Sequence, residues 1–172
     1  GLFKEREIMS DSKLISKITV RNPQQTAKVA AALAPYLKVQ DVVALNGTLG
    51  AGKTEFARAL IRALCEHELD VPSPTFNLLL TYDCAKGPIY HYDFYRLEDP
   101  EEVWELDIED AFYEGITLME WSENIGDHLP DSLLEILICI PSSDLTTEDA
   151  EQREISLLGD EGWHTRLSGL KV

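Results

Sequence analysis

The segment GTLGAGKT, residues 47–54, has residue types at a spacing suited to binding phosphate. It fits the pattern G-x-x-x-x-G-K-[ST] and lies between an apolar run and an amphipathic one, as that pattern requires. Its glycines let the backbone curl so that successive N–H groups point at phosphate oxygens. Lys53 can reach the β- and γ-phosphates of a nucleotide, and the Thr54 hydroxyl can bind Mg²⁺. The segment therefore predicts a nucleotide site, against the plainer alternative of a glycine-rich turn with a surface lysine.

Two carboxylates are candidates for holding the metal or orienting water. Asp93 ends the run IYHYD and Glu120 ends the run ITLME, and both runs have the composition of strands. Ligands of open α/β sheets bind at the carboxyl ends of the strands, where both side chains should emerge. Each could instead be an ordinary acid at a strand end. The other acidic residues cluster in 98–114, where a solvated helical surface is the better interpretation.

Other residues near these strands are open to a chemical or a packing role. In the segment PSPT, Ser73 and Thr75 supply hydroxyls where a γ-phosphate-sensing loop would lie, unless the segment is only a proline-stiffened turn. Trp121 is more typical of a core or an interface, and His91 of a packed histidine than of a catalyst. Arg96 could neutralise phosphate or pair with an acid. The sequence has no N-K-x-D signature for reading guanine, so ATP is favoured over GTP.

The elements that must position these residues alternate between strand and helix patterns. Asn22, Pro23 and Gln25 predict a helix start. Its apolar stripe would be Ala27, Ala30, Leu33, Ala34 and Leu37. Further helices are expected from Thr54 to about Glu66 and from Asp99 to about Tyr113. Strands are expected at 15–20, as an exposed edge, at 41–46, as a buried centre, and at 77–82, 88–93, 116–121, 133–140 and 153–159.

The connections between these elements predict the fold class. The short DCAKG link between 77–82 and 88–93 suits a hairpin, which implies a mixed sheet. The last two strands suit a terminal antiparallel pair. Together these patterns predict a three-layer α/β/α fold in a single domain over residues 14–172. Residues 1–13 are expected to lie outside that domain, as an expression remnant or a processed end, and the tail GWHTRLSGL yields no prediction.

Charge and cysteine content limit the partners. The net charge is −16, from 31 acidic and 15 basic residues, whereas nucleic-acid affinity comes largely from lysine and arginine. The acidic surface is either simply solvated or a docking face for a basic partner. Three cysteines without a C-x-x-C pair predict reduced thiols, no disulfide framework and a cytoplasmic location. No apolar run approaches the ~20 residues of a membrane helix, so no membrane partner is expected.

In combination, the motifs resemble the TsaE family. The matching stretches are G-x-L-G-A-G-K-T, S-P-T-F, Y-H-Y-D-F-Y-R-L and M-E-W-S-E, in order from about Thr19 to Ile140. Members of that family are small bacterial P-loop ATPases needed to make threonylcarbamoyladenosine beside the anticodon of certain tRNAs. The resemblance implies a P-loop NTPase fold. The family's usual I-E-W is Met119-Glu120-Trp121 here, a departure that keeps the glutamate.

The resemblance also implies roles for individual residues. The phosphates of ATP would be held by Leu49, Gly50, Ala51, Gly52, Lys53 and Thr54. Mg²⁺ would be bound by Thr54 and Glu120, and Asp93 would support hydrolysis. Ser73 and Thr75 would belong to a nucleotide-responsive loop, and Trp121 would lie beside the site.

The implied partner is the TsaD–TsaB pair, which transfers the threonylcarbamoyl group while the ATP cycle of this chain drives or resets it. tRNA would be bound only through those partners, and no DNA partner is expected. A small-molecule kinase is the alternative, because GTLGAGKT also fits the loop of compact kinases. No arginine-rich lid segment is visible to support it. A nucleotide-sensing module without turnover is a third possibility.

Overall fold

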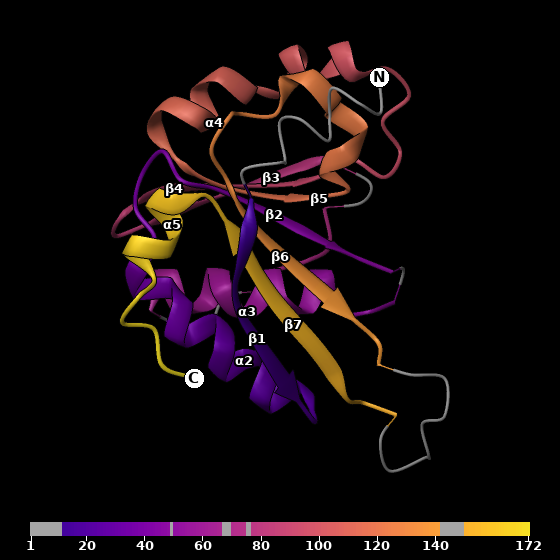
Figure 1. Ribbon diagram of the computed structural model, residues 1–172. Coiled ribbons are helices and arrows are strands. Elements are labelled where there is room, and N and C mark those ends of the chain that lie inside the picture. The colour runs from indigo at the N-terminus through magenta and orange to yellow at the C-terminus, as the bar shows by residue number, and fades with distance from the viewer. Residues whose placement is uncertain (1–11, 49, 67–69, 75–76, 142–149) are drawn as a thin grey trace.

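The computed structural model describes residues 12–48, 50–66, 70–74, 77–141 and 150–172 (Figure 1). Its strands form one seven-stranded sheet in the order β1-β7-β6-β2-β5-β4-β3. The strands are β1 (Lys13–Val20), β2 (Val42–Gly47), β3 (Leu79–Cys84), β4 (Gly87–Asp93), β5 (Ile116–Glu120), β6 (Leu134–Cys139) and β7 (Arg153–Gly159). The α-helices are α2 (Pro23–Leu33), α3 (Lys53–Cys65), α4 (Ile108–Glu114) and α5 (Glu161–Arg166), and the 3₁₀ helices are η2 (Ala34–Tyr36), η3 (Pro100–Leu106) and η4 (Ser122–His128).

The sheet is mixed, as the sequence predicted. Strand β2 pairs in parallel with both β5 and β6, and β4 pairs in parallel with β5. The β3–β4 hairpin and the β6–β7 pair are antiparallel, and β1 pairs antiparallel with β7 at the edge. The carboxyl ends of β2, β5 and β4 therefore lie at one end of the sheet.

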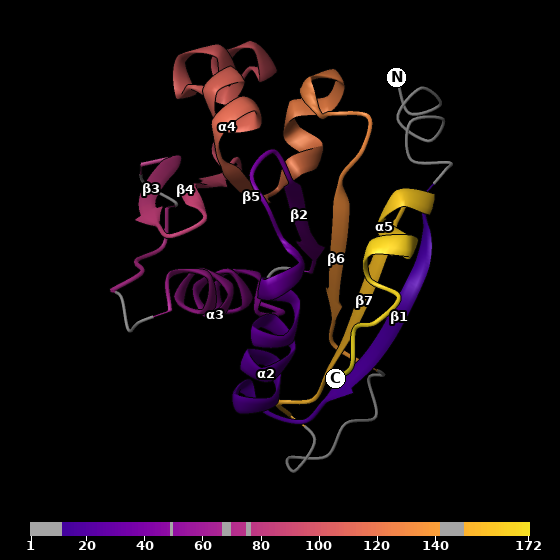
Figure 2. The same cartoon turned by 90° about the vertical axis from the view of Figure 1, so that its left-hand side faces the viewer.

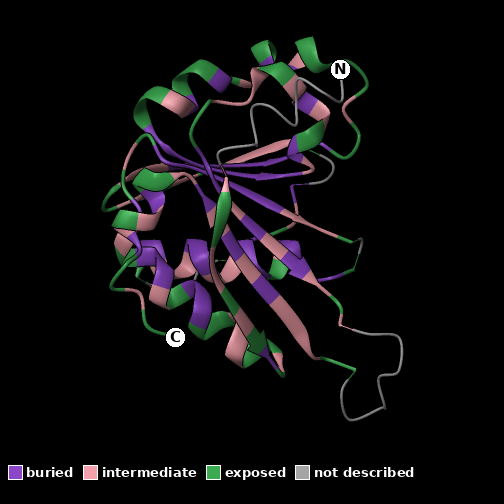
Figure 3. Ribbon diagram, viewed as in Figure 1, coloured by how far each residue is buried: buried purple, intermediate pink, exposed green. Residues whose placement is uncertain are grey.

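Helices cover the two faces of the sheet in three layers, which confirms the predicted fold class (Figures 1 and 2). Helices α2 and α3 lie on one face, and their buried side chains share a core with β1, β6 and β7. Helix α4, η3 and η4 lie on the other face and form a second core with Val42 and Ala44 of β2 and the tyrosines of β4. Buried residues concentrate on the central strands and on the sides of α2 and α3 that face them (Figure 3).

Helix α2 begins where its capping residues predict. Asn22 is the N-cap, its side chain accepts a hydrogen bond from the Gln25 N–H, and Pro23 occupies the first turn. The predicted apolar stripe is wrong at Ala27, which is exposed, whereas Val29 is buried in its place. A helix places side chains three and four residues apart on one face, and Val29, Ala30 and Leu33 satisfy that spacing.

Two predicted elements differ from those observed. The strand expected at 77–82 begins at Leu79, because Leu78 has a positive φ and its N–H bonds to the Pro74 carbonyl in a turn. The acidic helix expected from Asp99 is divided into η3 and α4 by Asp107, which has a left-handed conformation. Asp99 nevertheless caps η3, as its position suggested.

The expectation of three reduced thiols is wrong in the structure. Cys65 at the end of α3 and Cys84 at the end of β3 form a disulfide, with Cα atoms 4.7 Å apart, and Cys139 is free. The two cysteines are 19 residues apart, so no local sequence pattern indicates that they pair. The packing of α3 beside β3 brings them together. The cytoplasmic location consequently remains a prediction without support from the thiols. None of the described helices is long and apolar enough to cross a membrane.

The tail that gave no prediction contains α5. Asp160 caps it by accepting a hydrogen bond from the Trp163 N–H, a local signal that the sequence did carry. Arg166 bonds to the carboxylate of Asp41 just before β2, and its guanidinium stacks on Trp163. The tail thereby docks against the beginning of the central strand.

Candidate functional site

The strand-end residues of the sequence pattern meet at one edge of the sheet. Strand β2 runs into the glycine loop (residues 47–54), and α3 begins inside that loop at Lys53. Asp93 and Glu120 are the last residues of the neighbouring parallel strands β4 and β5, and they are directly paired in register. Both side chains are almost fully buried, at 4% and 2% exposure. Because these strands are parallel, their ends lie beside the loop.

The outer two glycines of the loop both have a positive φ, and one of them also lies against a neighbouring strand. A Cβ on Gly47 would lie 2.1 Å from the Ile138 carbonyl oxygen, so the close approach of β6 requires glycine there. Gly52 has φ of +112°, a conformation that side chains rarely adopt. Of the residues that the structure describes, only the far end of Glu55 lies as near as 4.0 Å to its Cβ position. Both glycines thus shape the loop through a positive φ, and Gly47 in addition lets the neighbouring strand pack.

Lys53 lies in the site with its ammonium held by two contacts. Its Nζ donates to the Gly47 carbonyl oxygen at 2.9 Å and lies 3.7 Å from the centre of the Trp121 ring. Burial lowers the pKa of Lys53, while the nearby carboxylates of Glu123, Glu120 and Asp93 act in the opposite direction. Neither contact is a salt bridge, so the ammonium can exchange both for stronger anionic acceptors.

Glu120 is held by a partner on each oxygen. Its Oε1 accepts a hydrogen bond from the Thr54 hydroxyl at 2.6 Å, and its Oε2 lies 2.8 Å from Nε2 of His91. His91 is fully buried on β4, two residues before Asp93. The interpretation of His91 as merely a packed histidine is therefore incomplete, because it contacts a candidate metal ligand.

Asp93 and Trp121 complete the wall opposite the loop. The Tyr95 N–H donates to Asp93 Oδ1 at 3.0 Å. The centres of the Tyr95 and Trp121 rings lie 4.9 Å apart. Consecutive strand residues point to opposite faces, but Trp121 has φ of +58° just after β5 ends. That left-handed turn lets the indole line the same pocket as Glu120.

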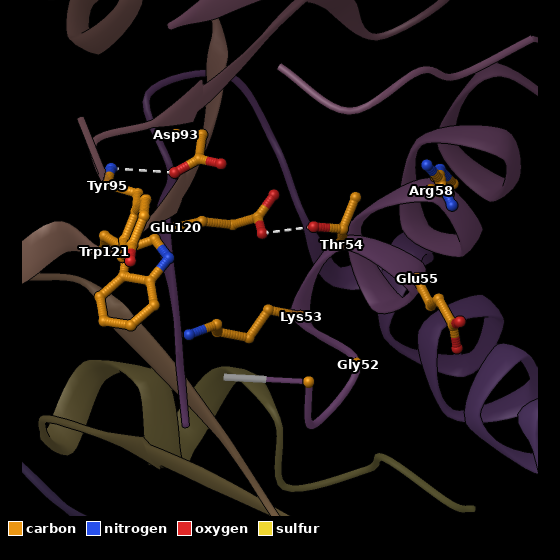
Figure 4. Close-up of a pocket in the computed structure, with 10 residues that line it drawn as sticks. Gly52, Lys53, Thr54, Glu55, Arg58, Asp93, Tyr95, Glu120 and Trp121 are labelled. Carbon is orange, nitrogen blue, oxygen red and sulfur yellow. Dashed lines mark hydrogen bonds between the residues drawn. The ribbon is translucent and has the colours of Figure 1, made fainter. Parts of the chain in front are cut away.

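These residues surround a pocket of about 400 Å³ (Figure 4). Its lining is Gly50, Gly52, Lys53, Thr54, Glu55, Arg58, Asp93, Tyr95, Glu120 and Trp121. A second pocket of about 190 Å³ shares Gly50, Gly52 and Glu55 with the first and extends to Thr26 of α2 and Arg153 of β7. The glycine loop thus lines two pockets, one acidic and aromatic and one that reaches α2.

The structure brings together most of the predicted residues that it describes. Gly50, Gly52, Lys53, Thr54, Asp93, Glu120 and Trp121 line the first pocket, and Ala51 lines the second. Leu49 and Thr75 lie outside the described residues. Ser73 is partly exposed and Arg96 exposed, and neither belongs to the lining of the first pocket.

Several residues of these pockets escaped the sequence argument, among them Tyr95, Arg58 and Arg153. Tyr95 follows Asp93 by two positions and lies within the quoted stretch Y-H-Y-D-F-Y-R-L, but it was not singled out as a site residue. Arg58 lies on α3, and its Nε donates to the Val71 carbonyl at 2.7 Å. Arg153 donates from Nε to the Ala51 carbonyl at 3.0 Å, across a separation of 102 residues. Contacts over such distances in sequence leave no local pattern.

Comparisons with known proteins point to one family. The family model described as threonylcarbamoyl adenosine biosynthesis protein TsaE matches residues 20–154. The tRNA threonylcarbamoyladenosine biosynthesis protein TsaE of Rickettsia felis is 47% identical over 119 residues, covering 69% of this chain and 70% of that protein. The protein of the same name from Bacillus subtilis is 38% identical over 118 residues, covering 68% and 73%.

A solved structure agrees with these sequence matches. The crystal structure of Bacillus subtilis YdiB superposes with a TM-score of 0.70 at 28% identity, covering 92% of this chain and 93% of that one. That superposition covers a larger share of this chain than either relative does, at 92% against 69% and 68%. From the family match and the similarity of its relatives, we conclude that this chain belongs to the TsaE family.

Proposed function

We propose that this chain is a Mg²⁺-dependent ATPase that serves the formation of threonylcarbamoyladenosine in tRNA. The observation that carries the proposal is the 2.6 Å hydrogen bond between the Thr54 hydroxyl and the buried Glu120 carboxylate, next to the Lys53 ammonium. A hydroxyl at the start of a helix that follows a glycine loop, next to a carboxylate from a neighbouring strand end, supplies the oxygen ligands expected for Mg²⁺ on nucleotide phosphates. The proposal seats the phosphates along residues 49–54 and the nucleoside in the second pocket.

Binding of the phosphates would depend on the backbone and on one cation. The N–H groups at the start of α3 have no partners within the helix, and the helix dipole adds positive potential there. Lys53 would exchange the Gly47 carbonyl for β- and γ-phosphate oxygens. That exchange is favourable because a charge-assisted hydrogen bond to phosphate is stronger than one to a neutral carbonyl.

The donor set fits Mg²⁺. Thr54 Oγ1 and Glu120 Oε1 are hard oxygen ligands side by side, and Asp93 is paired in register with Glu120. Among the described residues, no three histidine, cysteine or acidic side chains are grouped to hold a metal by themselves. This suits Mg²⁺, which takes one or two protein ligands and completes its shell with water and substrate phosphates. When bound, the metal would neutralise charge that develops on the phosphates.

Asp93 is the residue we assign to orienting the attacking water. Its Oδ1 is held by the Tyr95 N–H, which fixes the carboxylate at the wall of the pocket opposite the glycine loop. Tyr95 and Trp121 would restrict the entry of bulk water from that side. Glu120 would hold the metal while Asp93 acts on the nucleophile, so the two buried acids would have separate roles.

The partner proposed for this ATPase is the TsaD–TsaB pair. The relatives in the comparison carry the name of a tRNA threonylcarbamoyladenosine biosynthesis protein. A chain with a net charge of −16 is a poor ligand for a polyanion, so the partners would hold the tRNA. The ATP cycle of this chain would then drive or reset the transferase.

Phosphate release from ATP tests the proposal, measured for the chain alone and with the TsaD–TsaB pair, with Mg²⁺ and with EDTA. Mg²⁺-dependent release that rises with the partners is expected, together with weak or no tRNA binding by the chain alone at physiological salt. Nucleotide binding without turnover in any mixture would favour a sensing module. Submicromolar, salt-sensitive tRNA affinity of the isolated chain would contradict the division of labour.

A further inference from the structure

His91 faces the nucleotide side of the sheet from inside the core. Side chains alternate along a strand, so His91 and Asp93 of β4 point to the same face. Leu118 and Glu120 are their register partners on β5 and share that face. Leu118 belongs to the core under α2 and α3, whereas Tyr90 and Tyr92 pack into the opposite core. The imidazole therefore lies directly behind the carboxylate of Glu120.

The two oxygens of Glu120 are held from opposite sides. Thr54 donates to Oε1 at 2.6 Å, and His91 Nε2 lies 2.8 Å from Oε2. An ionised carboxylate can only accept, so Nε2 carries the proton in this contact. With both oxygens engaged, the terminal torsion of Glu120 cannot rotate without breaking a hydrogen bond. Oε1 is thereby directed toward Thr54 and the pocket.

Packing alone does not account for a histidine at this position. Its side chain has no exposed surface, and its register neighbours on β3 and β5 are Leu80 and Leu118. Nδ1 of His91 is buried without a hydrogen-bond partner among the described residues. A buried polar atom without a partner is unfavourable, and an apolar side chain would avoid it. Within the part of the chain that the structure describes, the one polar contact of this ring is the contact to Glu120.

We propose that His91 is a positioning residue, which holds Glu120 so that Oε1 is presented to a divalent cation bound with the nucleotide. The inference rests on the proposed function, in which Glu120 is a metal ligand. Groups that orient a metal ligand typically change metal affinity 10–100-fold when removed. His91 should accordingly affect the metal requirement of nucleotide binding and leave metal-free binding unchanged.

The test compares three variants by Mg²⁺ titration of ATP binding, with a parallel measurement in EDTA. His91→Leu removes the donor and should raise the Mg²⁺ midpoint by about tenfold or more. His91→Gln can place an amide N–H near the position of Nε2 and should recover most of that loss. Thr117→Val is the matched control, because Thr117 is fully buried on β5 and its hydroxyl has no hydrogen-bond partner among the described residues. Its side chain points to the face of the sheet opposite to that of Glu120. The midpoint of Thr117→Val should equal that of the original chain.

The outcomes separate this inference from the proposed function. If the original chain needs Mg²⁺ and His91→Leu keeps its midpoint, only the role of His91 is wrong. If His91→Leu weakens binding equally with Mg²⁺ and in EDTA, the residue is structural and the inference also fails. If ATP binding by the original chain does not depend on Mg²⁺, both the role of His91 and the proposed function are overturned. Should His91→Leu not fold, His91→Asn replaces it, because its shorter amide cannot reach Oε2.

Discussion

The ammonium of Lys53 lies 3.7 Å from the centre of the Trp121 ring, over its face. Trp121 approaches it through a left-handed turn directly after Glu120. A cation over an indole is worth about 0.5–2 kcal/mol, less than charge-assisted bonds to phosphate. The indole therefore keeps the ammonium in the pocket. The contact is weak enough for the ammonium to move to an anion.

Mg·ATP should consequently change the fluorescence of Trp121, because the phosphates draw the ammonium away from the ring. Emission spectra of the original chain and of Trp121→Phe, each titrated with Mg·ATP, measure the effect. The change should disappear in Trp121→Phe and persist in Trp104→Phe, whose indole is exposed on η3 and hydrogen-bonded to Glu101. An identical spectral change in Trp121→Phe would show that the indole does not sense the site.

Lys53→Ala should weaken Mg·ATP binding and abolish turnover, because it removes the ammonium from the phosphate end of the pocket. Hydrogen bonds to charged groups are worth about 1.5–3 kcal/mol, which corresponds to about 10–100-fold in the dissociation constant. Calorimetry measures the affinity, and Lys28→Ala, at an exposed position of α2, is the control for the lost charge. Unchanged Mg·ATP affinity in Lys53→Ala would contradict the assignment of the glycine loop as a nucleotide site.

The two buried acids should separate binding from hydrolysis. Glu120→Ala removes a proposed metal ligand and should reduce both Mg²⁺-dependent nucleotide affinity and turnover. Asp93→Ala should lower turnover on the order of 100-fold or more while nearly preserving Mg·ATP affinity, since its role is in the transition state. Binding and phosphate release are measured across a Mg²⁺ titration, with the exposed Asp110→Ala as the charge-matched control.

The reverse pattern would exchange the two assignments. If Asp93→Ala loses Mg²⁺-dependent affinity while Glu120→Ala retains it, Asp93 is the metal ligand. If turnover is unchanged in both variants, neither carboxylate takes part in the reaction.

Glu135 should make the stability of the fold depend on pH. Burial raises the pKa of this carboxyl above its ordinary 4.5, Glu123 adds to the rise, and the 3.1 Å hydrogen bond from Asn46 Nδ2 opposes it. The folded state therefore holds this proton more tightly than the unfolded state. The corresponding stability is present below pH 4.5 and is lost as the pH rises through the folded pKa.

Glu135→Gln has no proton to lose and should be relatively more stable above that window. Urea unfolding at a series of pH values gives the free energy of unfolding of the original chain minus that of the variant. This difference should fall from pH 4.5 upward and then level off. The exposed Glu109→Gln serves as the control for the general effect of removing one negative charge. A difference that stays constant with pH would contradict the shifted pKa.

The Cys65–Cys84 disulfide should stabilise the fold by about 3 kcal/mol, the chain-entropy value for a loop of this size. Thermal unfolding with and without a reducing agent measures the effect. Reduction should lower the Tm of the original chain to that of Cys65→Ser/Cys84→Ser, and should leave the Tm of the double variant unchanged. Equal Tm values for the original chain in both conditions would mean that the two thiols are reduced in solution.

The sequence by itself determined the features that depend on local geometry. Asn22 and Pro23 start a helix because their side chains satisfy or remove N–H groups within one turn. The spacing of Gly47, Gly52, Lys53 and Thr54 predicted a loop that leads from a buried strand into a helix, and the structure has that loop. Alternation along the strand likewise puts His91 and Asp93 on one face.

Only the tertiary structure decided which of these residues meet. Glu120 contacts Thr54 across 66 residues and His91 across 29, and Arg153 reaches Ala51 across 102. These contacts depend on the parallel register of β4 with β5 and on the docking of α3 over them. Register and docking are fixed by the summed packing of two cores, a property that no short segment carries. The sequence therefore predicted a site for phosphate, whereas the fold decided how its glutamate is held.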